Sequence, residues 1–130
     1  LGANMANAVK VIAEAEAYNG PSLIIGYAPC ELHGVKGGMN HCQDEMKKAV
    51  AAGYWNLFSY NPALKAEGKN PFTLTSKPGD GSYQEFLNNE TRYSRLTRSF
   101  PDRAEKLFKA SEEAAKARYE HLLRLVELYK

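Results

Sequence analysis

The chain has 130 residues, of which 44% are hydrophobic and 25% charged, and its formal net charge is +2. This size and composition suit one globular domain or a piece of a larger one. Basic residues are interspersed with acidic ones and no apolar run approaches the roughly 18 residues of a membrane span, so we expect neither nucleic acid nor membrane as a partner. Two cysteines without a secretory signal favour a reducing compartment, the cytoplasm or an anaerobic organelle, over a structural disulfide.

The first elements are predicted to be a helix and a buried strand. Apolar residues at helical spacing predict a helix over residues 3–18, with Asn4 as its cap and Asn19-Gly20 as its end. The unbroken run from Leu23 to Ile25 predicts a strand over residues 21–29 that is buried on both faces. We expect these elements to form a right-handed α/β unit whose preceding strand is missing, which predicts a fragment of a larger domain. The apolar face of the helix consists of Met5, Ala8, Val9, Ile12 and Ala13.

The segments after residue 42 predict a second strand and then mostly helices. Residues 54–62 have the pattern of a strand that Asn61-Pro62 stops, and residues 83–100 that of a helix with Phe86, Tyr93 and Leu96 directed inward. Pro101 begins a long helix that continues to the C-terminus. The other expected elements are a glycine-rich loop over 27–42, a helix over 43–52, a surface loop over 63–71, a short extended segment over 72–76 and a turn over 77–82.

The predicted C-terminal helix has one apolar stripe with small residues near its middle. Close packing on a parent protein is the simplest explanation of such a stripe, and a helical interaction module is an alternative function for the chain. The stripe consists of Ala104, Leu107, Phe108, Ser111, Ala115, Leu122, Val126 and Tyr129. The fold class that we expect is α/β in the first half, followed by a mostly helical C-terminal segment.

Both cysteines and two of the three histidines lie within residues 27–42. Cys30, His33, His41 and Cys42 are suitable zinc ligands by type, so a small zinc-binding module is a second alternative function. The spacing is poor, because adjacent His41 and Cys42 rarely point to the same metal. Taken singly, the histidines are ordinary polar residues of a loop, and Cys42 is a small, partly buried apolar residue.

Of these four residues, Cys30 is the one best placed for a chemical role. It directly follows Pro29 at the end of the predicted buried strand. Open α/β sheets bind ligands at the carboxyl ends of their strands, so a thiol there is placed for catalysis or for metal ligation.

Two glycine-rich stretches are not cofactor motifs. Gly79-Asp80-Gly81 is similar to the thiamine diphosphate signature, but no buried strand precedes it and no asparagine follows Asn89, so we predict a turn. The run from Gly34 to Gly38 has neither the spacing nor the Lys-Ser/Thr of a phosphate loop.

Three stretches carry a family resemblance. They are EAEAYNGPSLIIGYAPCELHGVKGGM (residues 14–39), KKAVAAGYWNLFSYNP (47–62) and GKNPFTLTSKPGDGSYQEFLNNETRYSRL (68–96). Together they resemble the C-terminal part of the pyruvate:ferredoxin (flavodoxin) oxidoreductases over nearly the whole chain. The segment around Cys30 resembles the wider group of 2-oxoacid:ferredoxin oxidoreductases.

The resemblance implies a fold and a site. Residues 1–62 would be the C-terminal part of a thiamine diphosphate-binding α/β domain with its cluster-ligand loop, and residues 63–130 a loop and helical extension of that domain. Cys30 corresponds to the fourth cysteine ligand of a [4Fe-4S] cluster whose other three ligands lie upstream of this chain. Cys42 matches no ligand of the family. We further hypothesise that backbone N–H groups of the glycine-rich loop tune the potential of this cluster, which replacement of Gly34 or Gly37 by valine would test.

The resemblance also implies a reaction and partners. Pyruvate and coenzyme A would be converted to acetyl-CoA and CO2, with electrons passing through iron–sulfur clusters to ferredoxin or flavodoxin. Thiamine diphosphate and Mg2+ would be bound in the intact enzyme, which is expected to be a homodimer. No catalytic residue is expected within this chain, because the magnesium-binding motif and the other cluster cysteines are absent from it. The 130 residues alone are therefore predicted to be inactive.

Overall fold

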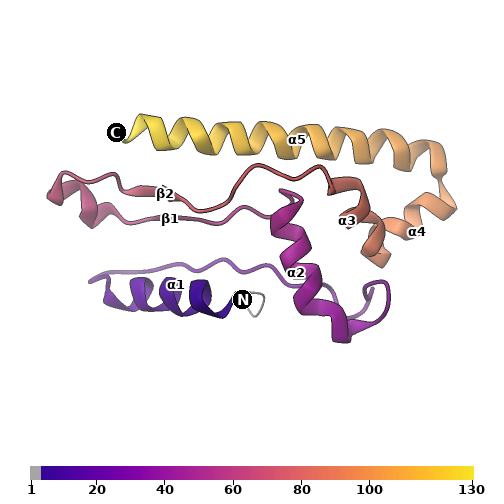
Figure 1. Cartoon of the computed structure of the whole chain (residues 1–130), viewed down its shortest axis with the longest axis horizontal. Coiled ribbons are helices and arrows are strands. Elements are labelled where there is room, and N and C mark those ends of the chain that lie inside the picture. The colour runs from indigo at the N-terminus through magenta and orange to yellow at the C-terminus, as the bar shows by residue number, and fades with distance from the viewer. Residues whose placement is uncertain (1–3) are drawn as a thin grey trace.

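The computed structural model describes residues 4–130 and shows a helix-dominated α/β chain. Helix α5 runs along one side of the molecule, the two short strands lie beside its C-terminal half, and α1 lies on the far side of those strands (Figure 1). The helices are α1 (Met5–Ala17), α2 (Cys42–Ala51), α3 (Tyr83–Asn89), α4 (Thr91–Ser99) and α5 (Pro101–Leu128). The strands are β1 (Phe58–Tyr60) and β2 (Phe72–Leu74), and short 3₁₀ helices span Met39–His41 and Pro62–Glu67.

Helix α1 forms where the apolar spacing and the Asn4 cap predict it. The side chain of Asn4 accepts a hydrogen bond from the backbone N–H of Asn7 at 3.0 Å, a cap of the kind that stabilises a helix by about 1 kcal/mol. Of the predicted apolar face, Ala8 is buried, whereas Met5, Val9 and Ile12 are exposed. Local sequence thus determines the helix, while most of its large apolar side chains stay uncovered.

The predicted buried strand over residues 21–29 is wrong for this structure. The segment is extended but has no regular secondary structure, and Leu23 and Ile25 are 84% and 70% exposed. A strand exists only when another strand pairs with its backbone, and the one sheet within residues 4–130 is the β1–β2 pair. The right-handed α/β unit therefore does not form here, although the extended segment lies beside α1 (Figure 1).

The second predicted strand is confirmed only in part. Strand β1 covers three residues of the predicted 54–62, and β2 falls within the predicted extended segment. The two pair antiparallel, with Phe58 opposite Leu74 and Tyr60 opposite Phe72. The predicted surface loop between them contains the 3₁₀ helix, which Gly68 ends in a left-handed conformation at φ +68°. This hairpin is a local unit and needs no missing strand.

The core lies between α2, α3, α4 and α5. Phe86 is 1% exposed there, and Tyr93 and Leu96 pack against the same cluster, as predicted. The expected helix over 83–100 is instead two helices, because Glu90 is extended at φ −83° and ψ 118°. The buried core consists of Ala49, Ala52, Tyr83, Phe86, Leu87, Ala104, Phe108 and Ala115.

Helix α5 begins at Pro101 as predicted and is held to the rest of the chain. Ala104, Phe108, Ala115 and Leu122 of the predicted stripe are buried, whereas Leu107 is 53% exposed at its edge. Arg118 donates hydrogen bonds to the carbonyl oxygen of Tyr54 at 2.8 Å and to the side-chain oxygen of Asn56 at 3.2 Å. The stripe is thus used within the chain, which removes the main argument for a helical interaction module.

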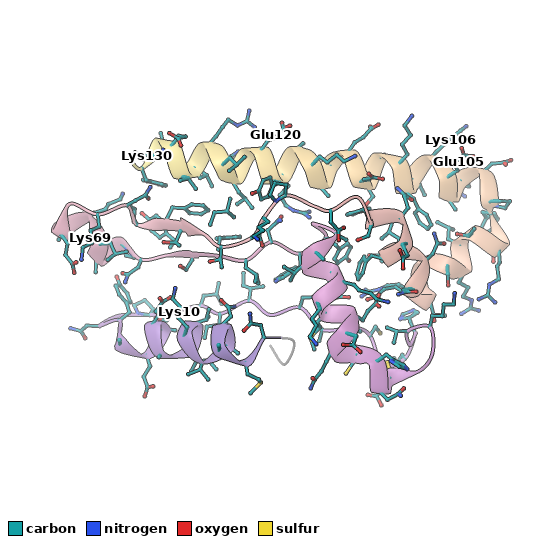
Figure 2. The ribbon with its side chains drawn as sticks, viewed as in Figure 1. Lys10, Lys69, Glu105, Lys106, Glu120 and Lys130 are labelled. Carbon is teal, nitrogen blue, oxygen red and sulfur yellow. The ribbon has the colours of Figure 1, made fainter. Side chains whose placement is uncertain are left out.

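The solvent side of α5 is charged. Glu105, Lys106 and Glu120 project away from the other elements (Figure 2). Within residues 4–130, no helix combines the length and apolar character needed to cross a lipid bilayer.

Candidate functional site

Cys30 lies where the extended segment enters a tight turn. The backbone N–H of Gly34 donates to the carbonyl oxygen of Cys30 at 2.8 Å, which closes a turn over residues 31–33. The Cys30 thiol is partly exposed, and His33 Nδ1 lies 3.0 Å from its Sγ. The backbone of the turn also lies around this thiol, and the N–H groups of His33 and Leu32 contribute to lowering its pKa. The turn after Cys30 therefore shapes the environment of its sulfur.

These groups favour the thiolate form of Cys30. The hydrogen bond from the His33 side chain is the largest cause that lowers the pKa of Cys30 below its usual value, and the backbone N–H of His33 comes second. The thiolate is the form that binds metals and acts as a nucleophile. The N–H of Gly34 is used by the carbonyl oxygen of Cys30. The backbone groups of the loop that lower the pKa of the thiol are those of residues 32 and 33, and the effect of the loop on a cluster potential stays a prediction.

The four candidate zinc ligands do not form one site. His41 ends the 3₁₀ helix and Cys42 is the first residue of α2, where its thiol is free and partly buried. Within residues 4–130, no group of three or more His, Cys, Asp or Glu side chains is close enough to hold a metal ion. Of the candidate set, the structure brings Cys30 and His33 into contact.

The chemistry of Cys30 fits one ligand of an iron–sulfur cluster. Clusters of the [4Fe-4S] type are held by four cysteine thiolates, and their potentials depend on hydrogen bonds to the sulfurs and on exposure. Cys30 offers a partly exposed sulfur that contacts His33 Nδ1 at 3.0 Å and whose pKa is lowered. The whole chain has two cysteines, so it supplies too few thiolates to hold such a cluster alone.

The segment that carries Cys30, residues 27–38, is here named the Cys30 loop, and it is fastened to the junction of α3 and α4. Val35 and Glu90 form an antiparallel bridge. On either side of it, the N–H of Lys36 donates to the carbonyl oxygen of Asn89 at 2.8 Å, and the N–H of Thr91 donates to that of Gly34 at 3.2 Å. The loop therefore takes its position from helices about sixty residues later in the sequence.

A buried polar contact holds the start of the Cys30 loop. Tyr27 O–H donates to the carboxylate of Glu90, which is 1% exposed and also accepts from Arg92 Nε at 3.1 Å. Burial is the main cause that raises the pKa of Tyr27 far above its usual value, so the phenol remains a donor. The Tyr27 ring packs beside Trp55 and Phe86, with centroids 5.9 and 6.4 Å away.

Sequence reasoning missed Glu90 altogether. A glutamate within a helical pattern is normally an exposed surface residue, and no local signal distinguishes this one. A second buried carboxylate nearby, Glu45, accepts a hydrogen bond from Asn89 at 3.2 Å. Desolvation is the largest cause that raises the pKa of Glu45 above its usual value.

The predicted turn at Gly79-Asp80-Gly81 is confirmed. The side chain of Asp80 accepts hydrogen bonds from the N–H and hydroxyl of Ser82 at 2.9 and 2.5 Å. The N–H of Asp80 donates to the carbonyl oxygen of Ala51 at 2.9 Å, so the turn packs against the end of α2. This Asp is therefore a turn residue that precedes α3, with its carboxylate engaged locally.

Comparison with known proteins shows that the chain is similar to one segment of several pyruvate oxidoreductases. No family model matches it. It is 50% identical over 127 residues to a pyruvate:ferredoxin oxidoreductase of Moorella thermoacetica, covering 98% of this chain and 11% of the relative. It is 47% identical over 125 residues to a pyruvate-flavodoxin oxidoreductase of Klebsiella pneumoniae, covering 96% of this chain and 11% of that protein. A mitochondrial pyruvate dehydrogenase (NADP+) of Euglena gracilis is 44% identical over 124 residues, covering 95% of this chain and 7% of its own length.

The chain thus spans about a tenth of the length of the curated relatives that it matches. The resemblance seen in the sequence is confirmed, and along almost its whole length this chain is homologous to one segment of the pyruvate:ferredoxin and pyruvate-flavodoxin oxidoreductases.

Proposed function

We propose that this chain acts as a segment of a pyruvate:ferredoxin or pyruvate-flavodoxin oxidoreductase and that Cys30 supplies one thiolate ligand to a [4Fe-4S] cluster. The observation that carries the proposal is the partly exposed Cys30 sulfur with His33 Nδ1 at 3.0 Å, in a chain with these relatives. The other ligands would come from elsewhere in the parent protein. The cluster, when bound, supplies one-electron transfer.

The residues around Cys30 would favour the thiolate form that binds iron. His33 and the two backbone N–H groups share the negative charge of the thiolate, and Pro29 restricts the backbone before it. Donors to a ligand sulfur favour the more negative, reduced state, so this turn would raise the cluster's reduction potential. The role of the chain is thus to hold and tune one ligand.

The substrate chemistry would take place on other parts of the parent enzyme. By homology the parent would oxidise pyruvate with coenzyme A to acetyl-CoA and CO2, pass electrons to ferredoxin or flavodoxin, and bind thiamine diphosphate with Mg2+. The residues of this chain do not fit the magnesium part of that site, since Asp80 is a turn residue. We therefore assign no thiamine step to this chain, and the chain by itself would be inactive.

The exposed apolar surface supports a place inside a larger domain. Met5 and Val9 of α1 and Leu23 and Ile25 of the extended segment beside it are all exposed, as expected of apolar residues that another part of a larger protein covers. Residues 1–62 would belong to the thiamine diphosphate-binding α/β domain, whose strands would cover this surface. Residues 63–130 would be its helical extension, and the shared core between α2 and α5 agrees with one common domain.

Two alanine variants of the full-length enzyme test the proposal. We expect Cys30→Ala to lose the iron of one cluster, because the thiolate is a direct ligand. Cys42→Ala is the matched control and should retain all iron. Iron content and electron paramagnetic resonance (EPR) of the reduced protein measure both. Equal iron in the Cys30→Ala variant and the wild type would refute the proposed ligand.

A further inference from the structure

The Cys30 loop has little regular structure of its own, so its position must come from contacts with other elements. After Cys30, its backbone pairs with residues 89–91 through the Val35–Glu90 bridge and the flanking hydrogen bonds. Before Cys30, the Tyr27 hydroxyl donates to the Glu90 carboxylate. The α3–α4 junction therefore holds the loop on both sides of the ligand, through the Glu90 side chain before Cys30 and through the backbone of residues 89 and 91 after it.

The local structure at Glu90 fits this role. The helical pattern of residues 83–99 is interrupted only at residue 90, whose extended backbone separates α3 from α4. This break leaves the carbonyl oxygen of Asn89 and the N–H of Thr91 available to the Cys30 loop. A continuous helix would use those groups internally.

The side chain of Glu90 would be unfavourable in the core without its partners. A buried carboxylate is strongly destabilising unless it is paired and hydrogen-bonded. Here Tyr27 donates to one carboxylate oxygen, and Arg92 donates to the other at 3.1 Å. Ordinary core packing does not need a carboxylate at this position, whereas a fixed attachment point for Tyr27 does.

We propose that Glu90 is a positioning residue for the cluster ligand, which fixes Cys30 by holding Tyr27 with its side chain and by the break in the helix that frees Asn89 and Thr91 to bind the backbone on either side of Val35. The inference rests on the function proposed above. It assigns to the C-terminal helices the task of setting where the Cys30 sulfur lies relative to the cluster. Loosening the contact would leave the chain folded while the ligand becomes mobile.

The test compares two phenylalanine variants in the full-length enzyme. Tyr27→Phe removes the hydroxyl bound to Glu90, and Tyr54→Phe removes a hydroxyl from the same aromatic cluster that pairs with Tyr93 at 2.7 Å. We expect Tyr27→Phe to release the iron of one cluster to a chelator several-fold faster than the wild type and to alter the EPR spectrum of that cluster. Tyr54→Phe should match the wild type in both measurements. Equal rates and spectra for the two variants would overturn the inference.

Glu90 variants add a rescue test. Glu90→Gln keeps an oxygen that accepts from Tyr27, so its iron release should lie closer to the wild type than that of Glu90→Ala; the reverse order would contradict the proposal. Should Glu90→Ala not fold, the Tyr27 and Tyr54 comparison decides alone. Cys30→Ala in the same set separates the two ideas. If Cys30→Ala keeps all its iron, both the proposed ligand role of Cys30 and the role of Glu90 are overturned. If Cys30→Ala loses iron but Tyr27→Phe and Tyr54→Phe behave alike, only the role of Glu90 is overturned.

Discussion

Phe86 joins the Cys30 loop to the helices, and its removal should destabilise the chain strongly. Its side chain is 1% exposed, and its ring lies 4.6 Å from that of Tyr54 and 6.4 Å from that of Tyr27. Truncation of a buried phenylalanine to alanine removes apolar contacts and leaves a cavity, at about 3–5 kcal/mol. The whole stability of a domain of this size is about 5–15 kcal/mol, so Phe86→Ala should be close to unfolding.

Urea denaturation of the chain measures this loss. Trp55 is the only tryptophan and lies 5.9 Å from the Tyr27 ring, so its fluorescence reports on the core where the two segments meet. With a urea dependence on the order of 1.5 kcal/mol per molar, the Phe86→Ala midpoint should fall by about 2–3 M.

Leu107→Ala is the matched control. Leu107 is 53% exposed on α5, so its truncation should change the free energy of unfolding by no more than about 0.5 kcal/mol. Similar midpoints for the two variants, or the absence of a cooperative transition in the wild-type chain, would refute the idea that one core unites the Cys30 loop with the helices.

Three further predictions concern single positions. Burial raises the pKa of Glu45 in the folded state above its unfolded value of 4.5. The stabilisation by the neutral carboxyl is therefore complete below pH 4.5 and is lost as the pH rises through the folded-state pKa. Glu45→Gln should raise the urea midpoint at pH 7 and remove that part of the pH dependence of stability. Gly79→Ala should lower the melting temperature by an amount equivalent to about 1–3 kcal/mol, because the new Cβ would lie 2.7 Å from the carbonyl oxygen of Ala52; an unchanged melting temperature would show that the backbone adapts freely. His33→Ala should raise the pKa of Cys30 and so slow its alkylation by iodoacetamide at neutral pH, whereas an unchanged rate would mean that the imidazole does not stabilise the thiolate.

Local signals in the sequence were sufficient for several elements. Asn4 caps α1, Pro101 begins α5, and Asp80 forms a turn with Ser82, each through contacts within a few residues. Such contacts depend little on the rest of the fold, so single-sequence reasoning finds them. The placement of Cys30 at the end of the extended segment was also predictable, because Pro29 and the turn after it are local features.

Features that depend on distant partners could not be predicted in this way. The run from Leu23 to Ile25 has the composition of a buried strand, but pairing requires a neighbour that the described residues do not provide. Helical periodicity continues across Glu90, so nothing local marks the break that lets residues 89–91 hold the Cys30 loop. The effect of Leu32 and His33 on the Cys30 thiol depends on the shape of one turn, which the glycine pattern did not specify.

The most direct test of the account is to locate iron in a structure of the full-length enzyme by anomalous diffraction at the iron edge. We expect iron bonded to Cys30 Sγ, with the other ligands of that cluster supplied from outside this chain and with His33 still in contact with the sulfur. A Cys30 sulfur with no iron bonded to it, in an enzyme whose clusters are all loaded, would contradict the central claim.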